Sequence, residues 1–514
     1  MAKESRVTKS LLNARMNLIC YFISLIAAFF TRKILLDYLG TEFIGFTGTL
    51  GSLLGFLNLT ELGVGVAIGY VLYKPIFDDN KTKIEEVISV FGYLYRIIGF
   101  FILGSGVILS CFLPLIFQNT EISLYIVYFG FYSYLFASLF GYFFNYRMSL
   151  LSADQRNYIV TGCFQLTNTT KVVVQMVLAY YTQNYCLFLL IELFTGVLNS
   201  AILNHIINQT YPWLESNIQQ GKHLFKKYPE IGKYIKQLFV HKIAGFVQFQ
   251  TLPLFIYSFV SLPMVAIYTN YTLVTQRVQS LMSGILDSTG AAVGNLISEG
   301  NRTKIFEVYR ELFAIRAFVS GILACCVYHL ISPFIILWLG GEYLLSKIVV
   351  ILVSVQMYLF LLRGTTDQFL FGYGLFYDVW APITESVLFM LLAVIFGASY
   401  GLPGVLIGPL GATLIIVYGW KPFFLFKKGF KRSVSNFYYL VLSHLLPTLL
   451  AYYFAVKVSN AIMSVIAIQF GWFNWILTSV LFTISIAIFL YLFAYPISKG
   501  LRIATNRFLK KRIR

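Results

Sequence analysis

Charged residues are scarce in this 514-residue sequence. Only 12% of its residues are charged, whereas soluble proteins have about a quarter, and 58% are hydrophobic with a mean hydropathy of +0.75. This composition excludes an ordinary soluble domain and indicates that most of the chain lies in a lipid bilayer. The net charge of +18 does not indicate nucleic-acid binding, because Lys and Arg are confined to short segments between long apolar runs.

Residues typical of catalytic and metal sites are also few. The six cysteines lie inside apolar runs without CxxC spacing, and the five histidines are scattered. The sequence has no GxxxxGK[ST] phosphate loop, no HExxH and no GxSxG motif. We therefore expect no enzyme activity, no cofactor and no metal, and any transport would use an ion gradient or the substrate's own gradient.

Long apolar runs are abundant instead. A helix needs about 20 apolar residues to cross the hydrocarbon core, and Gly, Pro and charged clusters divide this chain into about fourteen segments of that length or more. The sequence thus predicts an all-α polytopic membrane protein. The expected spans are 16–36, 44–73, 87–116, 122–146, 157–180, 186–208, 239–260, 264–297, 308–336, 344–370, 375–397, 402–426, 434–456 and 474–497.

The distribution of positive charge predicts the orientation. With the N-terminus in the cytoplasm, the segments on that side carry 30 of the 39 Lys and Arg residues, and the opposite connections hold only Lys347 and Lys457. Positively charged loops stay in the cytoplasm. An error of one span would destroy this asymmetry, so we expect an even number of spans with both termini in the cytoplasm.

An internal repeat predicts the domain organisation. Positions 78–87 read DDNKTKIEEV and positions 299–308 read EGNRTKIFEV, with six identities in ten, 221 residues and six spans apart. An even number of spans orients both copies alike, which indicates two parallel six-helix halves around a central site. We expect halves at 1–208 and 239–432, a cytoplasmic linker at 209–238, and two additional helices with a basic tail at 433–514.

Ionisable side chains within the spans are the best candidates for a binding site, because they are costly in lipid and usually face a bundle interior or an aqueous cavity. Arg277 lies in the middle of its span, and Asn270 lies seven residues earlier on the same helical face. Lys171 and Glu192 also lie in spans, and we assign them no role. The candidate cavity residues are Arg277, Arg32, Arg363, Asn270, Glu61, Glu385 and Asp367.

Each candidate has a structural alternative. Arg363 and Asp367 are four residues apart, which also suits a local ion pair that lets the span insert. Arg32 lies near the end of its span and could extend to the interface, and Glu61 and Glu385 could bridge helices. If guanidinium groups line a cavity, they favour an anion such as phosphate, whose oxygens suit the planar Arg fork.

Several stretches resemble the Wzx-type oligosaccharide-lipid flippases, a group within the multidrug/oligosaccharidyl-lipid/polysaccharide (MOP) exporter superfamily. The resemblance runs along most of the chain and depends on the order and spacing of the motifs. In the first half it rests on Arg32 and positions 39–45, 59–65, 72–75 and 150–155; in the second half it rests on positions 268–271, 293–301, 380–386 and 401–408.

The resemblance implies a bacterial inner-membrane flippase with a MATE-like fold. Such a protein moves undecaprenyl-diphosphate-linked oligosaccharide repeat units from the cytoplasmic to the outer leaflet for O-antigen or capsule synthesis. The headgroup would enter the cavity while the polyprenyl tail stays in lipid, with Arg277, Arg32 and Arg363 contacting diphosphate or sugar. The resemblance also allows further partners. These are membrane lipids, H+ or Na+ as a coupling ion, and polysaccharide polymerase or assembly proteins.

Three other classes of protein compete with this interpretation. A cation-coupled multidrug exporter of the same superfamily would need acidic or neutral cavity groups; Arg277 argues against it, whereas Glu61 and Glu385 favour it. A major-facilitator transporter lacks support, because the family's Gly-x-x-x-Asp-Arg type of loop is missing from 74–87. A membrane polymerase or ligase usually needs a large external loop, but the longest hydrophilic connection, 209–238, is expected in the cytoplasm.

Overall fold

The computed structural model divides the chain into two compact units, Met1–Ala266 and Ile267–Arg514, and the boundary falls inside helix α11. Helices form both units, and no strand occurs among the residues that the structure describes. The predicted fold class, an all-α polytopic membrane protein, is confirmed, whereas the division into halves and linker stays a prediction. The described residues are 6–58, 64–154, 156–229, 231–232, 235, 250–286, 289, 293, 296–297, 299–375, 377–466 and 469–512.

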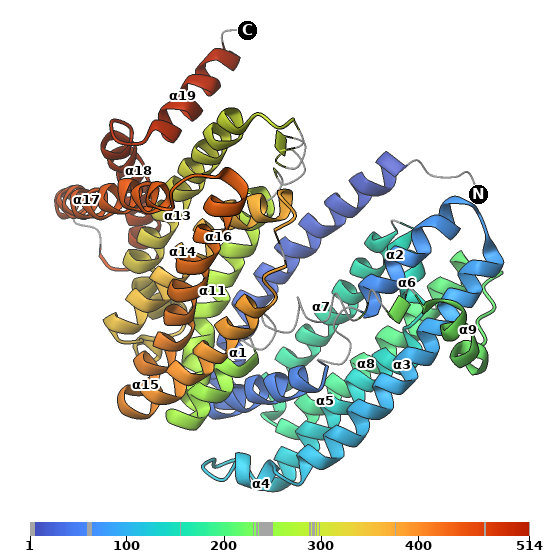
Figure 1. The fold of residues 1–514 in the computed structure, drawn as a ribbon. Coiled ribbons are helices and arrows are strands. Elements are labelled where there is room, and N and C mark those ends of the chain that lie inside the picture. Colours follow the sequence, from blue (N-terminus) through green and yellow to red (C-terminus); the bar gives the residue numbers. More distant parts are fainter. Residues whose placement is uncertain are drawn as a thin grey trace. The chain divides into compact units, whose positions relative to one another are not determined.

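In the unit Met1–Ala266, long apolar helices pack in antiparallel succession (Figure 1). Helix α1 packs along α7, and α5 packs along both α8 and α3. The elements are α1 (Arg6–Leu57), α2 (Val64–Phe77), α3 (Lys81–Ser110), α4 (Leu113–Ile116), α5 (Leu124–Phe144), α6 (Met148–Ala153), α7 (Asn157–Thr182), α8 (Tyr185–Thr210), η2 (Ile218–Gln220) and α9 (Gly221–Lys227). Residues 250–259 are also helical.

In the unit Ile267–Arg514, helix α13 packs against α14, α17, α18 and α19, and α17 pairs with α18. Its elements are most of α11 (Leu262–Leu286), α13 (Arg302–Trp338), η4 (Gly341–Tyr343), α14 (Lys347–Gly372), α15 (Trp380–Ala412), the π-helical η5 (Thr413–Trp420), α16 (Lys421–Phe424), the π-helical η6 (Leu425–Phe430), α17 (Ser435–Ile466), α18 (Trp472–Ala494) and α19 (Lys499–Arg512).

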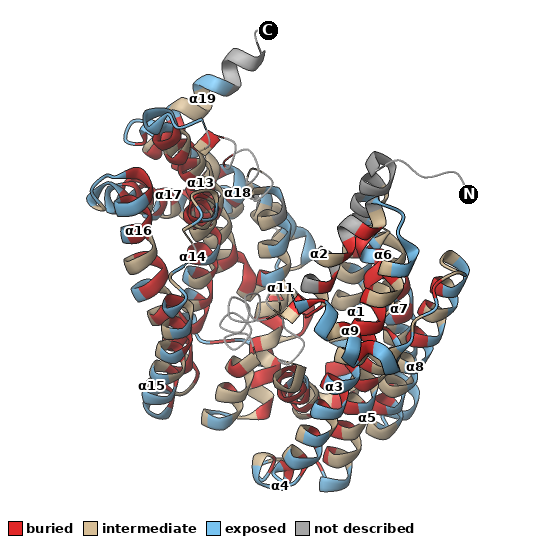
Figure 2. Ribbon diagram, turned by 45° about the vertical axis from the view of Figure 1, so that its right-hand side comes forward, coloured by how far each residue is buried: buried red, intermediate tan, exposed pale blue. Residues whose placement is uncertain are grey.

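Nine helical stretches of the described chain are long and apolar enough to cross a membrane. Ile19–Leu57 and Trp380–Phe430 have 39 and 51 residues, enough for two crossings each at about 20 residues per crossing. Helices α7 and α11, with 26 and 25 residues, are long enough as well. Exposed apolar side chains such as Phe100, Leu391 and Ile395 lie on these helices, and exposed positions alternate with buried ones along α15 (Figure 2). These apolar surfaces suit contact with lipid.

Two glycines bend the longest helices. Gly40 inside α1 has φ 81° and ψ 165°, and Gly401 inside α15 has φ 58° and ψ −134°. Side-chain-bearing residues rarely adopt these conformations, whereas glycine adopts them readily. Each glycine thus lets one long helical stretch turn back on itself, and the expected breaks at 37–43 and 398–401 are kinks rather than loops.

The repeated sequence begins a helix in each unit. The Asn80 side chain accepts a hydrogen bond from the Lys83 amide at 3.0 Å at the start of α3. Asn301 accepts one from the Lys304 amide at 3.1 Å at the start of α13. This side-chain cap satisfies a backbone donor that has no partner within the helix. The identical residues of the repeat therefore share one local structural role.

Candidate functional site

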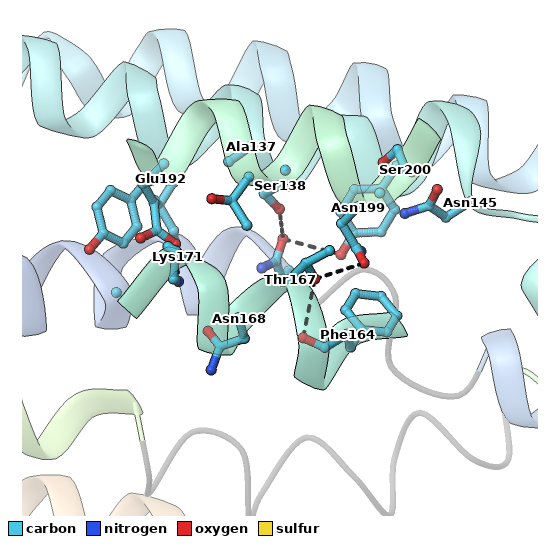
Figure 3. Close-up of a pocket in the computed structure, with 18 of the residues that line it drawn as sticks. Ala137, Ser138, Asn145, Phe164, Thr167, Asn168, Lys171, Glu192, Asn199 and Ser200 are labelled. Atoms are coloured by element: carbon cyan, nitrogen blue, oxygen red, sulfur yellow. Dashed lines mark hydrogen bonds and ion pairs between the residues drawn. The ribbon is translucent and has the colours of Figure 1, made fainter. Parts of the chain in front are cut away.

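A polar cavity of about 590 Å³ lies within the unit Met1–Ala266. Residues from α1, α3, α5, α7 and α8 line it, together with Gln250. Lys171 and Glu192 lie at one end, whereas Asn145, Asn199 and Ser200 lie at the other (Figure 3). This volume is in the range of typical small-molecule sites, about 300–1,000 Å³. The cavity is therefore large enough to hold a ligand headgroup.

Hydroxyl and carboxamide groups dominate the polar lining. Asn58 Oδ1 accepts hydrogen bonds from Ser138 at 3.2 Å and from Tyr142 at 3.1 Å. Across the cavity wall, Thr167 Oγ1 lies 3.1 Å from Asn199 Oδ1, joining α7 to α8 (Figure 3). Neutral groups of this kind bind polar ligands without requiring them to carry a net charge.

One ion pair faces the cavity. Lys171 Nζ on α7 lies 2.9 Å from Glu192 Oε1 on α8, and the two side chains are 18% and 19% exposed. Gln175 Nε2 lies 3.4 Å from the other oxygen, Glu192 Oε2. The sequence places these two charges in adjacent spans but gives them no role; the structure explains them as a pair that neutralises both charges within the membrane.

A second charged cluster lies in the unit Ile267–Arg514. Asp367 on α14 bridges two cations: its Oδ2 lies 3.0 Å from Arg363 Nε, and its Oδ1 lies 3.4 Å from Lys421 Nζ on α16. Glu385 on α15 lies near enough to Arg363 for their charges to interact. Glu385 is only 5% exposed, and within the described chain its Oε1 has no hydrogen-bond partner.

Three of the predicted candidates thus come together in this cluster, namely Arg363, Asp367 and Glu385. The ion pair expected from the four-residue spacing is present. Lys421, near the end of the expected span 402–426, is the fourth member and was not among the candidates. Its side chain is only 19% exposed. Its position at the border of an apolar run gave no signal that it turns towards a carboxylate on another helix.

The remaining candidates lie elsewhere. Arg32 on α1 donates from Nη2 to the Ala266 carbonyl at 2.7 Å. On α11, Asn270 is fully buried and Arg277 is half-buried. Glu61 lies outside the described residues. The roles of these side chains in a binding site stay predictions.

No group of three or more His, Cys, Asp or Glu side chains that could hold a metal ion occurs in the described part of the chain. The acidic residues that face the cavity or form the cluster are instead close to Lys or Arg. Both sites therefore combine carboxylates with cations, an arrangement that suits binding of a polar or anionic ligand.

Solved structures share this arrangement of helices. The lipid II flippase MurJ in an inward closed conformation matches with a TM-score of 0.65 and 14% sequence identity, covering 93% of this chain and 98% of that one. An inward-facing multidrug resistance MATE family transporter of the MOP superfamily matches with a TM-score of 0.59 and 16% identity, covering 78% and 92%. The chain shares the fold of these two structures.

A MATE transporter from Vibrio cholerae also matches, with a TM-score of 0.50 and 14% identity, covering 83% of this chain and 99% of that one. No protein-family model matches the chain, and no curated protein matches it. These likenesses establish the fold, which the resemblance in sequence had implied. Because one fold serves many functions, the substrate has to be argued from the chain's own side chains.

Proposed function

We propose that this chain is a transporter that moves undecaprenyl-diphosphate-linked oligosaccharide repeat units across the bacterial inner membrane by alternating access. It would carry the glycan from the cytoplasmic to the outer leaflet for surface-polysaccharide synthesis, with both of its own termini in the cytoplasm. The MOP fold supports transport, because its solved neighbours are a lipid-linked flippase and multidrug transporters. It would act without catalytic chemistry.

The observation that favours an anionic, sugar-bearing substrate is the pairing of Glu192. A site for a cationic drug needs a carboxylate that the drug can neutralise. Among the described residues that line the cavity, Glu192 is the one carboxylate, and Lys171 already holds it at 2.9 Å. The other polar lining groups are hydroxyls, carboxamides and tyrosines, which suit a glycan. The alternative, a cation-coupled multidrug exporter, is therefore less favoured.

The charged cluster on α14, α15 and α16 is suited to hold the diphosphate. Arg363 uses Nε for Asp367, and within the described chain no hydrogen bond occupies its two terminal nitrogens. Lys421 contributes a second cation at 3.4 Å from the same carboxylate. Two cations arranged around one carboxylate can bind phosphate oxygens by replacing or sharing that carboxylate.

Substitution of Lys421 tests this assignment. In proteoliposomes that contain a fluorescent undecaprenyl-diphosphate oligosaccharide, we expect Lys421→Met to slow flipping at least tenfold, because loss of a charge-assisted contact costs about 1.5–3 kcal/mol. Lys428→Met is the matched control, because Lys428 belongs to the same helical stretch but is exposed. Equal flipping by the natural chain and Lys421→Met would remove the cluster from the substrate path.

A further inference from the structure

We infer that the cavity of the unit Met1–Ala266 is a glycan subsite that takes a neutral, N-acetylated sugar residue. This inference rests on the proposed function and deepens it. It concerns this unit alone and the sugar portion of the substrate. Some hydrogen-bonding groups of the lining are already paired within the protein, and others remain for a ligand.

Asn58 presents a donor to the cavity. Two hydroxyls, those of Ser138 and Tyr142, donate to its Oδ1 at 3.2 and 3.1 Å. A carboxamide has one oxygen that accepts and one nitrogen that donates two hydrogen bonds. Because the two hydroxyls hold the oxygen, the Nδ2 group remains to donate to a ligand acceptor. A carbonyl oxygen is a strong acceptor for such a donor.

The end of the cavity away from Lys171 and Glu192 offers further polar groups. Asn199 and Ser200 are only 6% and 5% exposed, and both line the cavity (Figure 3). Asn199 Oδ1 lies 3.1 Å from Thr167 Oγ1, whose one hydroxyl hydrogen also reaches the Cys163 carbonyl at 2.9 Å, so the Asn199 carboxamide keeps hydrogen-bonding capacity for a ligand. Within the described chain, Ser200 Oγ is buried without a hydrogen-bond partner. A buried hydroxyl of this kind normally finds a partner, and a ligand N–H or hydroxyl would supply one.

The charge balance favours a neutral sugar. Lys171 and Glu192 neutralise each other, and Gln175 holds the second carboxylate oxygen. A uronic acid would have to separate this pair within the membrane, whereas an acetamido group needs only the remaining neutral donors and acceptors. Its carbonyl suits a carboxamide N–H, its own N–H suits a hydroxyl, and its methyl group can pack against apolar lining residues such as Leu54 and Phe164.

Glycines leave room for the sugar ring. A Cβ added at Gly51 on α1 or at Gly141 on α5 would meet no atom within 4 Å, and both positions line the cavity. Tyr95 and Tyr134 lie in the same lining and provide aromatic rings for sugar contact. Bare backbone next to aromatic rings allows a flat ring to approach closely. A side chain introduced at either glycine can therefore enter this space without a clash at its Cβ.

Ligand-observed NMR on the full chain in nanodiscs tests the inference with two soluble probes, methyl N-acetyl-β-glucosaminide and methyl β-glucoside. We expect the N-acetylated probe to bind at least tenfold more tightly, because the two hydrogen bonds to the acetamido group together contribute about that factor. Asn58→Asp keeps an acceptor for Ser138 and Tyr142 but removes the amide donor. It should reduce the preference to about threefold or less.

Gly141→Leu provides a second test that leaves the polar network intact. It should abolish binding of both probes by filling the cavity, whereas Gly104→Leu should not. Gly104 is the matched control, because a Cβ there also meets no atom within 4 Å but the position lies outside the cavity lining. Equal binding of the two sugars, unchanged binding by Gly141→Leu, or no binding of either sugar would each overturn the inference.

Transport separates this inference from the proposed function. If the natural chain flips lipid-linked oligosaccharides with and without an N-acetylated sugar at equal rates, the subsite assignment fails while the flippase function stands. If it flips neither substrate, the proposed function itself fails. We expect the natural chain to flip the N-acetylated substrate much faster and the Asn58→Asp variant to lose this preference. That result supports both the flippase function and the subsite.

Discussion

At the residue scale, the structure pairs charged side chains that lie far apart in the sequence. Lys171 and Glu192 lie 21 positions apart in the sequence, in adjacent predicted spans, yet their side-chain atoms are 2.9 Å apart. Sequence spacing could predict the pair Arg363 and Asp367, because residues four apart share a helical face. It could not predict pairs between helices, because these depend on the rotation of each helix about its axis.

Removal of one member of the cavity pair should destabilise the protein more than removal of both. Lys171→Met leaves the Glu192 carboxylate without its cation in a largely buried place, and we expect a loss of about 3 kcal/mol. Adding Glu192→Gln should restore most of that stability, since no charge then remains. Thermal unfolding of the purified chain and of these two variants measures both effects.

The pair Lys304 and Glu299 is the matched control. Its atoms are 2.7 Å apart, but both side chains are 54% exposed. Exposed pairs contribute about 0–1 kcal/mol, so Lys304→Met should scarcely change the unfolding temperature. A Lys171→Met variant as stable as Lys304→Met would contradict the structural role given to the cavity pair.

At the scale of the elements, glycines decide where the longest helices change direction. Apolar runs, and the Gly, Pro and charged clusters between them, predicted the number of spans, because the bilayer fixes the length of an apolar helix. It could not show that α1 and α15 continue through their turns, because a kink depends on one residue's backbone conformation. Gly40 and Gly401 adopt positive φ values that the composition of the segment does not reveal.

Substitution of Gly40 tests the kink. Nothing lies within 4 Å of a Cβ added there, so the cost of Gly40→Ala comes from the backbone conformation, and we expect a loss of about 1–3 kcal/mol. Gly104→Ala has the same open surroundings within the regular helix α3, and alanine should stabilise it by up to about 1 kcal/mol. Equal shifts in unfolding temperature for the two variants would show that the kink imposes no strain.

At the scale of the whole molecule, the sequence predicted the fold class but only part of the site. Apolar runs and the repeat at 78–87 and 299–308 indicated a helical membrane protein with related segments, and both copies of the repeat cap a helix with an asparagine. The cluster of Arg363, Asp367 and Glu385 drew on candidates already named. None of the cavity residues Asn58, Asn199 and Ser200 was a candidate. Neutral polar residues are common in spans, and the sequence does not show which of them lie side by side once the helices pack.

The most direct test of the central claim is substrate discrimination by the natural chain in proteoliposomes. We predict protein-dependent flipping of undecaprenyl-diphosphate oligosaccharide and no export of cationic dyes under a proton or sodium gradient. This result follows from a cavity carboxylate that is already paired with Lys171. Export of the dyes without movement of the lipid-linked sugar would contradict the account and favour the multidrug alternative.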